Sequence, residues 1–208
     1  MTEEQWLACD DFVPLLRAAG PRLTGRKLRL CVCGDKRHSG LPYPWLLPAI
    51  ELAERVADDL ATDRERAEGA AAVLEWEPQE EQEREEQERA ARILLADAGF
   101  FARLPTAFQY RPYQPDNVGT PEPGLCDRFR DVFGNPFRPV TFDPSWLTSD
   151  VAALARGMYE TCDFSPMPIL ADALQDAGCD SEDVLGHCRG PGPHVRGCWV
   201  VDLVLGKE

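Results

Sequence analysis

The feature that most constrains the fold is a helical repeat of apolar residues, interrupted by proline, glycine and helix-capping residues. Between positions 46 and 60, apolar side chains recur at the spacing of one helix face, with charged residues mostly elsewhere. Thr2 and Gln5 form a capping-box pattern at the start of the chain. Pro168 and Gly178 bracket another amphipathic stretch, as is typical of helix ends. We therefore expect an all-α protein, a multi-helix bundle.

Two segments fit either a helix or a strand. Residues 27–33 alternate like a strand, but Thr24 before them and Gly34 after them also suit a short helix. Residues 193–205 begin with a proline and are followed by Gly206, which again favours a helix. We predict a helix in both places.

Five prolines divide the chain in the middle, within residues 105–124, where neither helical nor strand periodicity is present. We expect a Pro-rich linker there. It would join an N-terminal helical region, residues 1–104, to a compact C-terminal helical domain, residues 125–208. The N-terminal region includes a charged helix at 79–98, whose first half we expect to be solvated. A chain of 208 residues is long enough for two small domains.

The charge of the chain limits its partners. With a net charge of −14, direct binding to nucleic acid and to anionic membrane surfaces is not expected. A basic protein partner fits the charge, and the acidic helix could present a surface to it. The opening Met1–Trp6 is acidic and polar, unlike a secretion signal, and no apolar run reaches the length of a bilayer span. We expect a cytoplasmic protein without membrane association, whose oligomeric state the sequence leaves open.

The last thirty residues hold two of the three histidines and three of the eight cysteines. Thiolate and imidazole are ligands that zinc prefers, so this cluster predicts a zinc site. The pair His194-x3-Cys198 has a suitable spacing if both residues lie on one helix. Alternatively, the cysteines are core thiols and the histidines bond to carbonyls of the Gly-Pro turn between them. The candidate metal ligands are Cys179, His187, Cys188, His194 and Cys198.

A second group combines Cys31, Cys33 and His38. Its Cys-x-Cys spacing is a poorer chelating pattern than Cys-x2-Cys, so two buried thiols beside a basic turn are the main alternative. A composite site that joins these cysteines to His187 and His194 is a further possibility.

Cysteine-dependent catalysis is the third use of these residue types. Cys188 or Cys198 could act as nucleophile with His194 as base, oriented by Asp180 or Asp202. The chain has no Gly-x-Ser-x-Gly, His-Glu-x-x-His or Walker motif. We therefore assign no catalytic residue and no organic cofactor.

Several segments resemble known bacterial sequences. Pro168–Gly178 resembles the LADWLEE-x-GD helix of the repeat-companion domains in large bacterial paralogue families. The tail His187–Asp202 is similar to the ending of an uncharacterised bacterial family that accompanies these domains, and so are the opening Met1–Asp10, Arg26–Leu30 and Phe133–Trp146. The chain departs from that pattern after Leu30. The resemblance covers the two ends of the chain and implies a mostly helical bacterial protein. It implies no activity, so no functional residues are carried over.

Taken together, these observations predict a non-enzymatic protein-interaction or accessory module of the bacterial cytoplasm. Two alternatives come from other classes of protein. One is a zinc-binding protein that uses the C-terminal cluster, with zinc as the candidate cofactor. The other is a cysteine-dependent enzyme.

Overall fold

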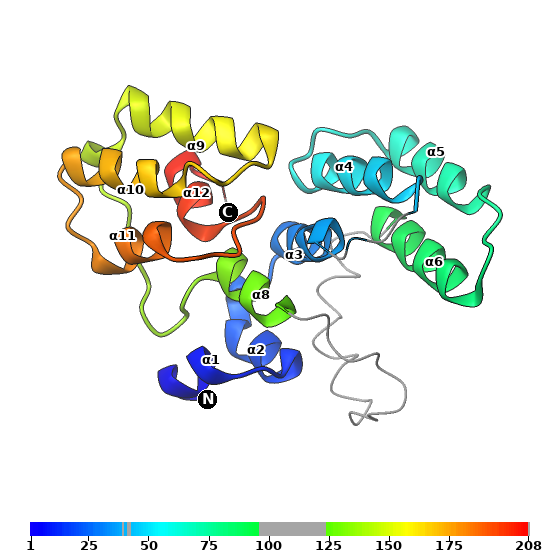
Figure 1. Cartoon of the computed structure of the whole chain (residues 1–208), viewed down its shortest axis with the longest axis horizontal. Helices are drawn as coiled ribbons and strands as arrows, with labels where there is room; N and C mark the ends of the chain where they lie inside the picture. Colours follow the sequence, from blue (N-terminus) through cyan, green and yellow to red (C-terminus); the bar gives the residue numbers. More distant parts are fainter. Residues whose placement is uncertain (39, 41–42, 96–123, 208) are drawn as a thin grey trace. The chain divides into compact units, whose positions relative to one another are not determined.

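The computed structural model describes residues 1–38, 40, 43–95 and 124–207, and every regular element in these ranges is a helix (Figure 1). The expected all-α, multi-helix fold is confirmed. None of the helices in these ranges combines the length and apolar character needed to cross a bilayer. The predicted Pro-rich linker, residues 105–124, lies almost entirely outside the described residues, as do residues 96–98 of the predicted charged helix.

Two compact units make up the chain: Met1–Arg22 together with Pro123–Glu208, and Leu23–Glu122. We call them unit 1 and unit 2. The first 22 residues thus belong with the C-terminal part of the chain. A division at the Pro-rich stretch places them with residues 23–104 instead.

Unit 1 holds the two N-terminal helices and all helices after the Pro-rich stretch. These elements are α1 (Glu3–Ala8), α2 (Phe12–Ala19), η1 (Gly20–Arg22), α8 (Leu125–Phe133), η2 (Pro144–Trp146), α9 (Ser149–Thr161), α10 (Met167–Asp176), α11 (Glu182–Arg189) and α12 (Trp199–Leu205). Of the stretch 193–205 predicted as a helix, residues 199–205 are helical, and the helix begins six positions after Pro193.

Helices α1 and α2 pack on α8 through aromatic side chains. Phe129 of α8 is fully buried and contacts Trp6 of α1, with ring centroids 6.0 Å apart, and Phe12 of α2, edge-on at 5.2 Å. It also stacks on Phe133 at 4.2 Å. The expected capping box of Thr2 is present and fixes the start of α1. We call α1, α2 and α8 the aromatic layer.

Helices α9–α12 enclose a second core in unit 1. Its buried members include Val151, Met158, Leu170, Leu174 and Val201, each no more than 2% exposed. In the described part of the chain, the side chains that make up or line this core come from residues 140–205. We call these four helices the C-terminal bundle.

Unit 2 consists of α3 (Gly25–His38), α4 (Leu46–Ala57), α5 (Asp63–Leu74) and α6 (Glu81–Leu95). Residues 27–33 lie within α3, so the helix predicted for them is confirmed. The side chains of Arg37 in α3 and Glu54 in α4 form a two-bond ion pair, at 2.8 and 2.9 Å. Glu54 is only 1% exposed and the side chain of Arg37 is 23% exposed, so this pair joins the two helices in a partly buried environment.

The N-terminal half of α6 is not fully solvated, contrary to the expectation from its charge. The carboxylate of Glu83 is buried and accepts hydrogen bonds from the indole N–H of Trp45 at 3.4 Å, the indole N–H of Trp76 at 3.0 Å and the backbone N–H of Gln79 at 2.9 Å. Gln87, one turn later, is also buried and donates to the carbonyl of Val73. A charged residue can be buried here because its hydrogen-bonding capacity is met, which periodicity alone does not reveal.

Candidate metal centre

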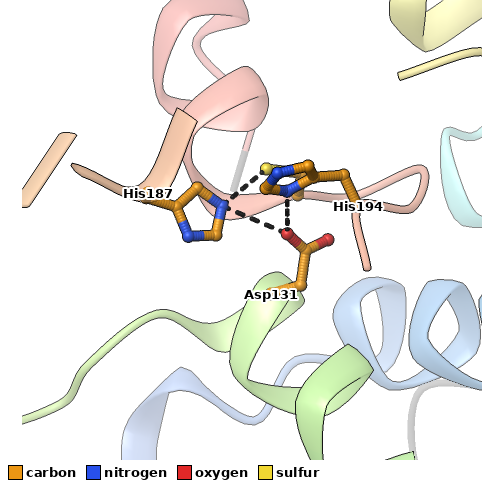
Figure 2. A group of neighbouring side chains, drawn as sticks. Asp131, His187 and His194 are labelled. Atoms are coloured by element: carbon orange, nitrogen blue, oxygen red, sulfur yellow. Dashed lines mark hydrogen bonds and ion pairs between the residues drawn. The ribbon is translucent and has the colours of Figure 1, made fainter. Parts of the chain in front are cut away.

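Four potential metal ligands converge within unit 1, although they come from four segments of the chain (Figure 2). Asp131 lies on α8, His187 on α11, His194 in the loop after α11, and Cys198 at the N-cap of α12. Each residue offers one donor atom, and these atoms all lie within 4.8 Å of one another. The site therefore joins the aromatic layer to the C-terminal bundle.

The closest contacts centre on the carboxylate of Asp131 and the ring of His187. Oδ1 of Asp131 lies 2.8 Å from Nδ1 of His194 and 3.1 Å from Nε2 of His187 (Figure 2). The same Nε2 of His187 lies 3.2 Å from Sγ of Cys198. A carboxylate oxygen, two imidazole nitrogens and a thiol sulfur thus face a common point.

The backbone fixes the orientation of the Asp131 carboxylate. Oδ2 accepts the backbone N–H of Val195 at 2.9 Å, which leaves Oδ1 directed at the two imidazoles. The preceding turn depends on Gly192, whose φ of +79° suits glycine and whose added Cβ would lie 3.0 Å from the backbone nitrogen of His194. The sequence Gly-Pro-Gly-Pro-His therefore directs His194 and Val195 towards α8.

The site is nearly closed to solvent. The side chains of Asp131, His194 and His187 are 2, 8 and 20% exposed, and Cys198 is fully buried. Burial by itself would raise the pKa of Asp131, but hydrogen bonds from His187 and His194, and the charges of these rings when protonated, outweigh it and lower the pKa. Asp131 is therefore an ionised carboxylate inside the protein.

Burial has the opposite result for Cys198. Removal from water, reinforced by the negative charge of Asp131, raises the pKa of this thiol well above its usual value, although the backbone amides of Val200 and Val201 oppose the shift. Without a metal ion, Cys198 is therefore a neutral thiol. A metal ion that bound its sulfur would displace the proton.

The donor set fits a zinc-type ion. Zinc binds cysteine sulfur at about 2.3 Å and histidine nitrogen or carboxylate oxygen at about 2.0–2.2 Å, so neighbouring ligands in a tetrahedral site lie about 3.3–3.6 Å apart. The contacts of 2.8, 3.1 and 3.2 Å between these side chains are slightly shorter. Small side-chain rotations would open this spacing.

Three of the five residues predicted as metal ligands take part in this cluster: His187, His194 and Cys198. The other two, Cys179 and Cys188, lie in the core of the C-terminal bundle, 3% and 0% exposed, and do not belong to the group. The structure also corrects one premise of the prediction. His194 and Cys198 do not share a helix, because α12 begins only at Trp199, and it is the loop that brings them together.

Sequence reasoning missed Asp131, which is 63 positions from His194 and belongs to no recognisable spacing. One signal was available. Asp131 lies between Phe129 and Val132 on α8, where all three residues are buried. An acidic residue within an apolar helix face needs a partner, and such positions are candidates for functional sites.

The second predicted group gives no comparable cluster. Cys31 and Cys33 are buried in α3, and Nδ1 of His38 lies 2.8 Å from the carbonyl of Gly34, one turn earlier in the same helix. In the described residues, the only group of three or more potential ligands that converge is the one in unit 1.

The geometry around His187 is not that of a nucleophilic triad. In a triad, one nitrogen of the histidine faces the nucleophile and the other faces the orienting carboxylate. Here Asp131 and Cys198 both approach Nε2 of His187. A carboxylate in that position competes with the thiol for the nitrogen and does not orient the ring towards it.

No protein-family model, curated protein or solved structure matches this chain. Any functional conclusion therefore rests on the side chains of the site themselves.

Proposed function

We propose that this protein binds one divalent transition-metal ion, most suitably zinc, through Asp131, His187, His194 and Cys198. The observation that carries the proposal is the position of Nε2 of His187, which faces both a carboxylate oxygen and a thiol sulfur at about hydrogen-bond distance. A metal ion requires several donor atoms to converge on one point. A hydrogen-bond network of the same residues could form without that convergence.

The number of donors and their burial support a structural role for the ion. Four protein ligands complete a tetrahedral shell, and a catalytic zinc usually keeps one position for water. The low exposure of Asp131, Cys198 and His194 leaves little room for a substrate. In this proposal the protein is a metal-stabilised helical module and does not use the metal for chemistry.

The test is the zinc content of the reduced, untagged protein, measured by elemental analysis after loading with zinc and extensive dialysis. We expect about one zinc per chain for the wild type, and loss of zinc from a His187→Ala/His194→Ala variant. The matched control is Cys179→Ala/Cys188→Ala, which removes the two buried thiols outside the cluster. Circular dichroism of each variant establishes that it has folded.

Retention of zinc by the histidine variant, or its loss from the cysteine control, would contradict the assigned ligands. The absence of bound zinc in a folded wild-type protein would contradict the proposal as a whole.

The interaction role predicted from the charge of the chain is compatible with this function. Glu81, Glu85 and Glu88 are exposed on α6 and could face a basic protein. That role, a place in the bacterial cytoplasm and membership of the family accompanying repeat-companion domains all stay predictions.

A further inference from the structure

The candidate site lies where the two cores of unit 1 meet. Asp131 comes from α8 in the aromatic layer, whereas His187, His194 and Cys198 come from α11, the following loop and the N-cap of α12. A metal ion bound by all four would therefore bond simultaneously to both parts of the unit.

The aromatic layer is held together by its own contacts. Besides the rings around Phe129, the guanidinium of Arg130 donates to the backbone carbonyls of Trp6, at 3.0 Å, and of Cys9. The amide of Asn135 donates to the carboxylate of Glu3 at 2.7 Å. These bonds connect α8, and the residue after its C-cap, to α1. Together with the ring contact between α2 and α8, they should make the three helices move as one body.

Contacts of a different kind join the layer to the C-terminal bundle. The carboxylate of Asp131 accepts hydrogen bonds from His187, His194 and the backbone of Val195. Close by, Gly134 at the C-cap of α8 packs against Trp199 so closely that an added Cβ would lie 3.2 Å from the indole ring. Much of this junction is polar and buried, and its central group is the carboxylate of Asp131.

We propose that occupancy of the metal site controls how firmly the aromatic layer is docked on the C-terminal bundle. This inference rests on the proposed metal-binding function. With the ion bound, a direct metal bond to the Asp131 carboxylate joins the layer to the bundle. Without it, the carboxylate depends on hydrogen bonds alone, so the layer opens more often. The site then acts as a metal-dependent clasp between two packed parts of one unit.

Amide hydrogen exchange of the full chain, measured by mass spectrometry with and without zinc, tests this inference. Peptides from α1, α2 and α8 should exchange roughly tenfold more slowly when zinc is bound, because opening of the layer is then opposed by the metal bond. Peptides from α9 and α10 should change less, and those from α4 and α5 in unit 2 provide the internal reference.

Two variants of α8 sharpen the result. Asp131→Asn removes the ligand contributed by the layer, so added zinc should no longer slow exchange in α1 and α2. Asp127→Asn, at a 61%-exposed position on the same helix, should respond to zinc like the wild type.

Zinc content is measured on the same samples, so the inference and the function beneath it can fail separately. Zinc bound at one equivalent, with equal slowing throughout unit 1 or none in the layer, would overturn the clasp and leave the metal site intact. No zinc bound to the folded protein would overturn both.

Discussion

Nε2 of His187 lies 3.2 Å from Sγ of Cys198, eleven positions further along the chain. His187 lies in the C-terminal part of α11 and Cys198 at the N-cap of α12. The Gly-Pro loop between them reverses the chain and brings the two side chains together. The ring of His187 is also held between those of His194 and Trp199, with centroids at 4.8 and 5.1 Å. Both candidate ligands are thus held in place by contacts of the fold itself, which reduces the ordering that metal binding requires.

Replacement of Asp131 by asparagine should destabilise the metal-free protein. Both imidazoles and the backbone N–H of Val195 point at this carboxylate, and an amide has one acceptor oxygen fewer. Leaving a buried donor without its acceptor costs about 1–3 kcal/mol of unfolding free energy. Urea denaturation followed by circular dichroism measures the loss.

Asp127→Asn is the matched control, because this residue is exposed on the same helix and pairs only with the side chain of Arg130 among its described contacts. We expect it to change the free energy of unfolding by at most about 0.5 kcal/mol. Equal effects of the two substitutions would show that the carboxylate of Asp131 has no special role.

The thiols should react in an order set by burial. Burial raises the pKa of Cys188 to about 12 and that of Cys126 to about 11, and the pKa of Cys198 lies well above the usual value. Thiolate is the reactive form, so near neutral pH these residues should be alkylated slowly. The half-buried Cys9 and Cys162 should react first. Mass spectrometry of the protein after brief treatment with iodoacetamide identifies the modified sites.

A Cys198 that reacted faster than Cys9 and Cys162 in the folded protein would be at odds with this account. Such a hyper-reactive thiol is what the cysteine-dependent enzyme requires.

In unit 2, Glu54→Gln should be strongly destabilising. The substitution keeps the shape of the side chain but removes the charge of Glu54 from the two-bond pair with Arg37, whose side chain is 23% exposed, and we expect it to lower the free energy of unfolding by about 1–3 kcal/mol. Glu51→Gln, at an exposed position of the same helix, should have little effect. Denaturant titrations of both variants give the comparison, and a similar small effect for both would mean that the pair adds no stability.

Glu65 should titrate far below an ordinary glutamate. The backbone N–H of Thr62, the side chain of Arg55 and the hydroxyl of Thr62 all donate to its carboxylate and lower its pKa from 4.5 to about 2. Because the folded-state pKa is the lower one, the stabilisation is present above about pH 4.5 and is lost as the pH falls through about 2. The side-chain chemical shift of Glu65, followed by NMR, should change with a midpoint near 2. A midpoint near 4.5 would mean that these hydrogen bonds do not persist in solution.

The helical fold could be predicted from the sequence because caps and apolar spacing act locally. Thr2, Asp11, Thr62 and Ser181 all cap the helices that follow them. One predicted helix was too long at its C-terminal end, because a turn stops it. The apolar stripe predicted through Leu60 ends at Ala57, since Asp59 adopts a positive φ and leaves Leu60 62% exposed.

The candidate site could be predicted only in part. His187, His194 and Cys198 lie near one another in sequence, so their residue types indicated metal chemistry before the fold was known. Asp131 reaches them only through the packing of α8 on the C-terminal bundle, and no local pattern encodes that packing. Cys179 and Cys188 are residue types that a metal site uses, but Cys179, which follows α10, and Cys188, on α11, both have their thiols buried in the apolar core.

The most direct test of the central claim is a titration of the reduced, metal-free protein with Co²⁺, followed by optical absorption. We predict saturation at one equivalent, visible bands of a tetrahedral Co²⁺ ion and a sulfur-to-cobalt charge-transfer band. That band should vanish in Cys198→Ser and remain in Cys188→Ser, whose thiol is equally buried but lies outside the cluster. The weak spectrum of six-coordinate Co²⁺, or a charge-transfer band that survives in Cys198→Ser, would contradict a site made of Asp131, His187, His194 and Cys198.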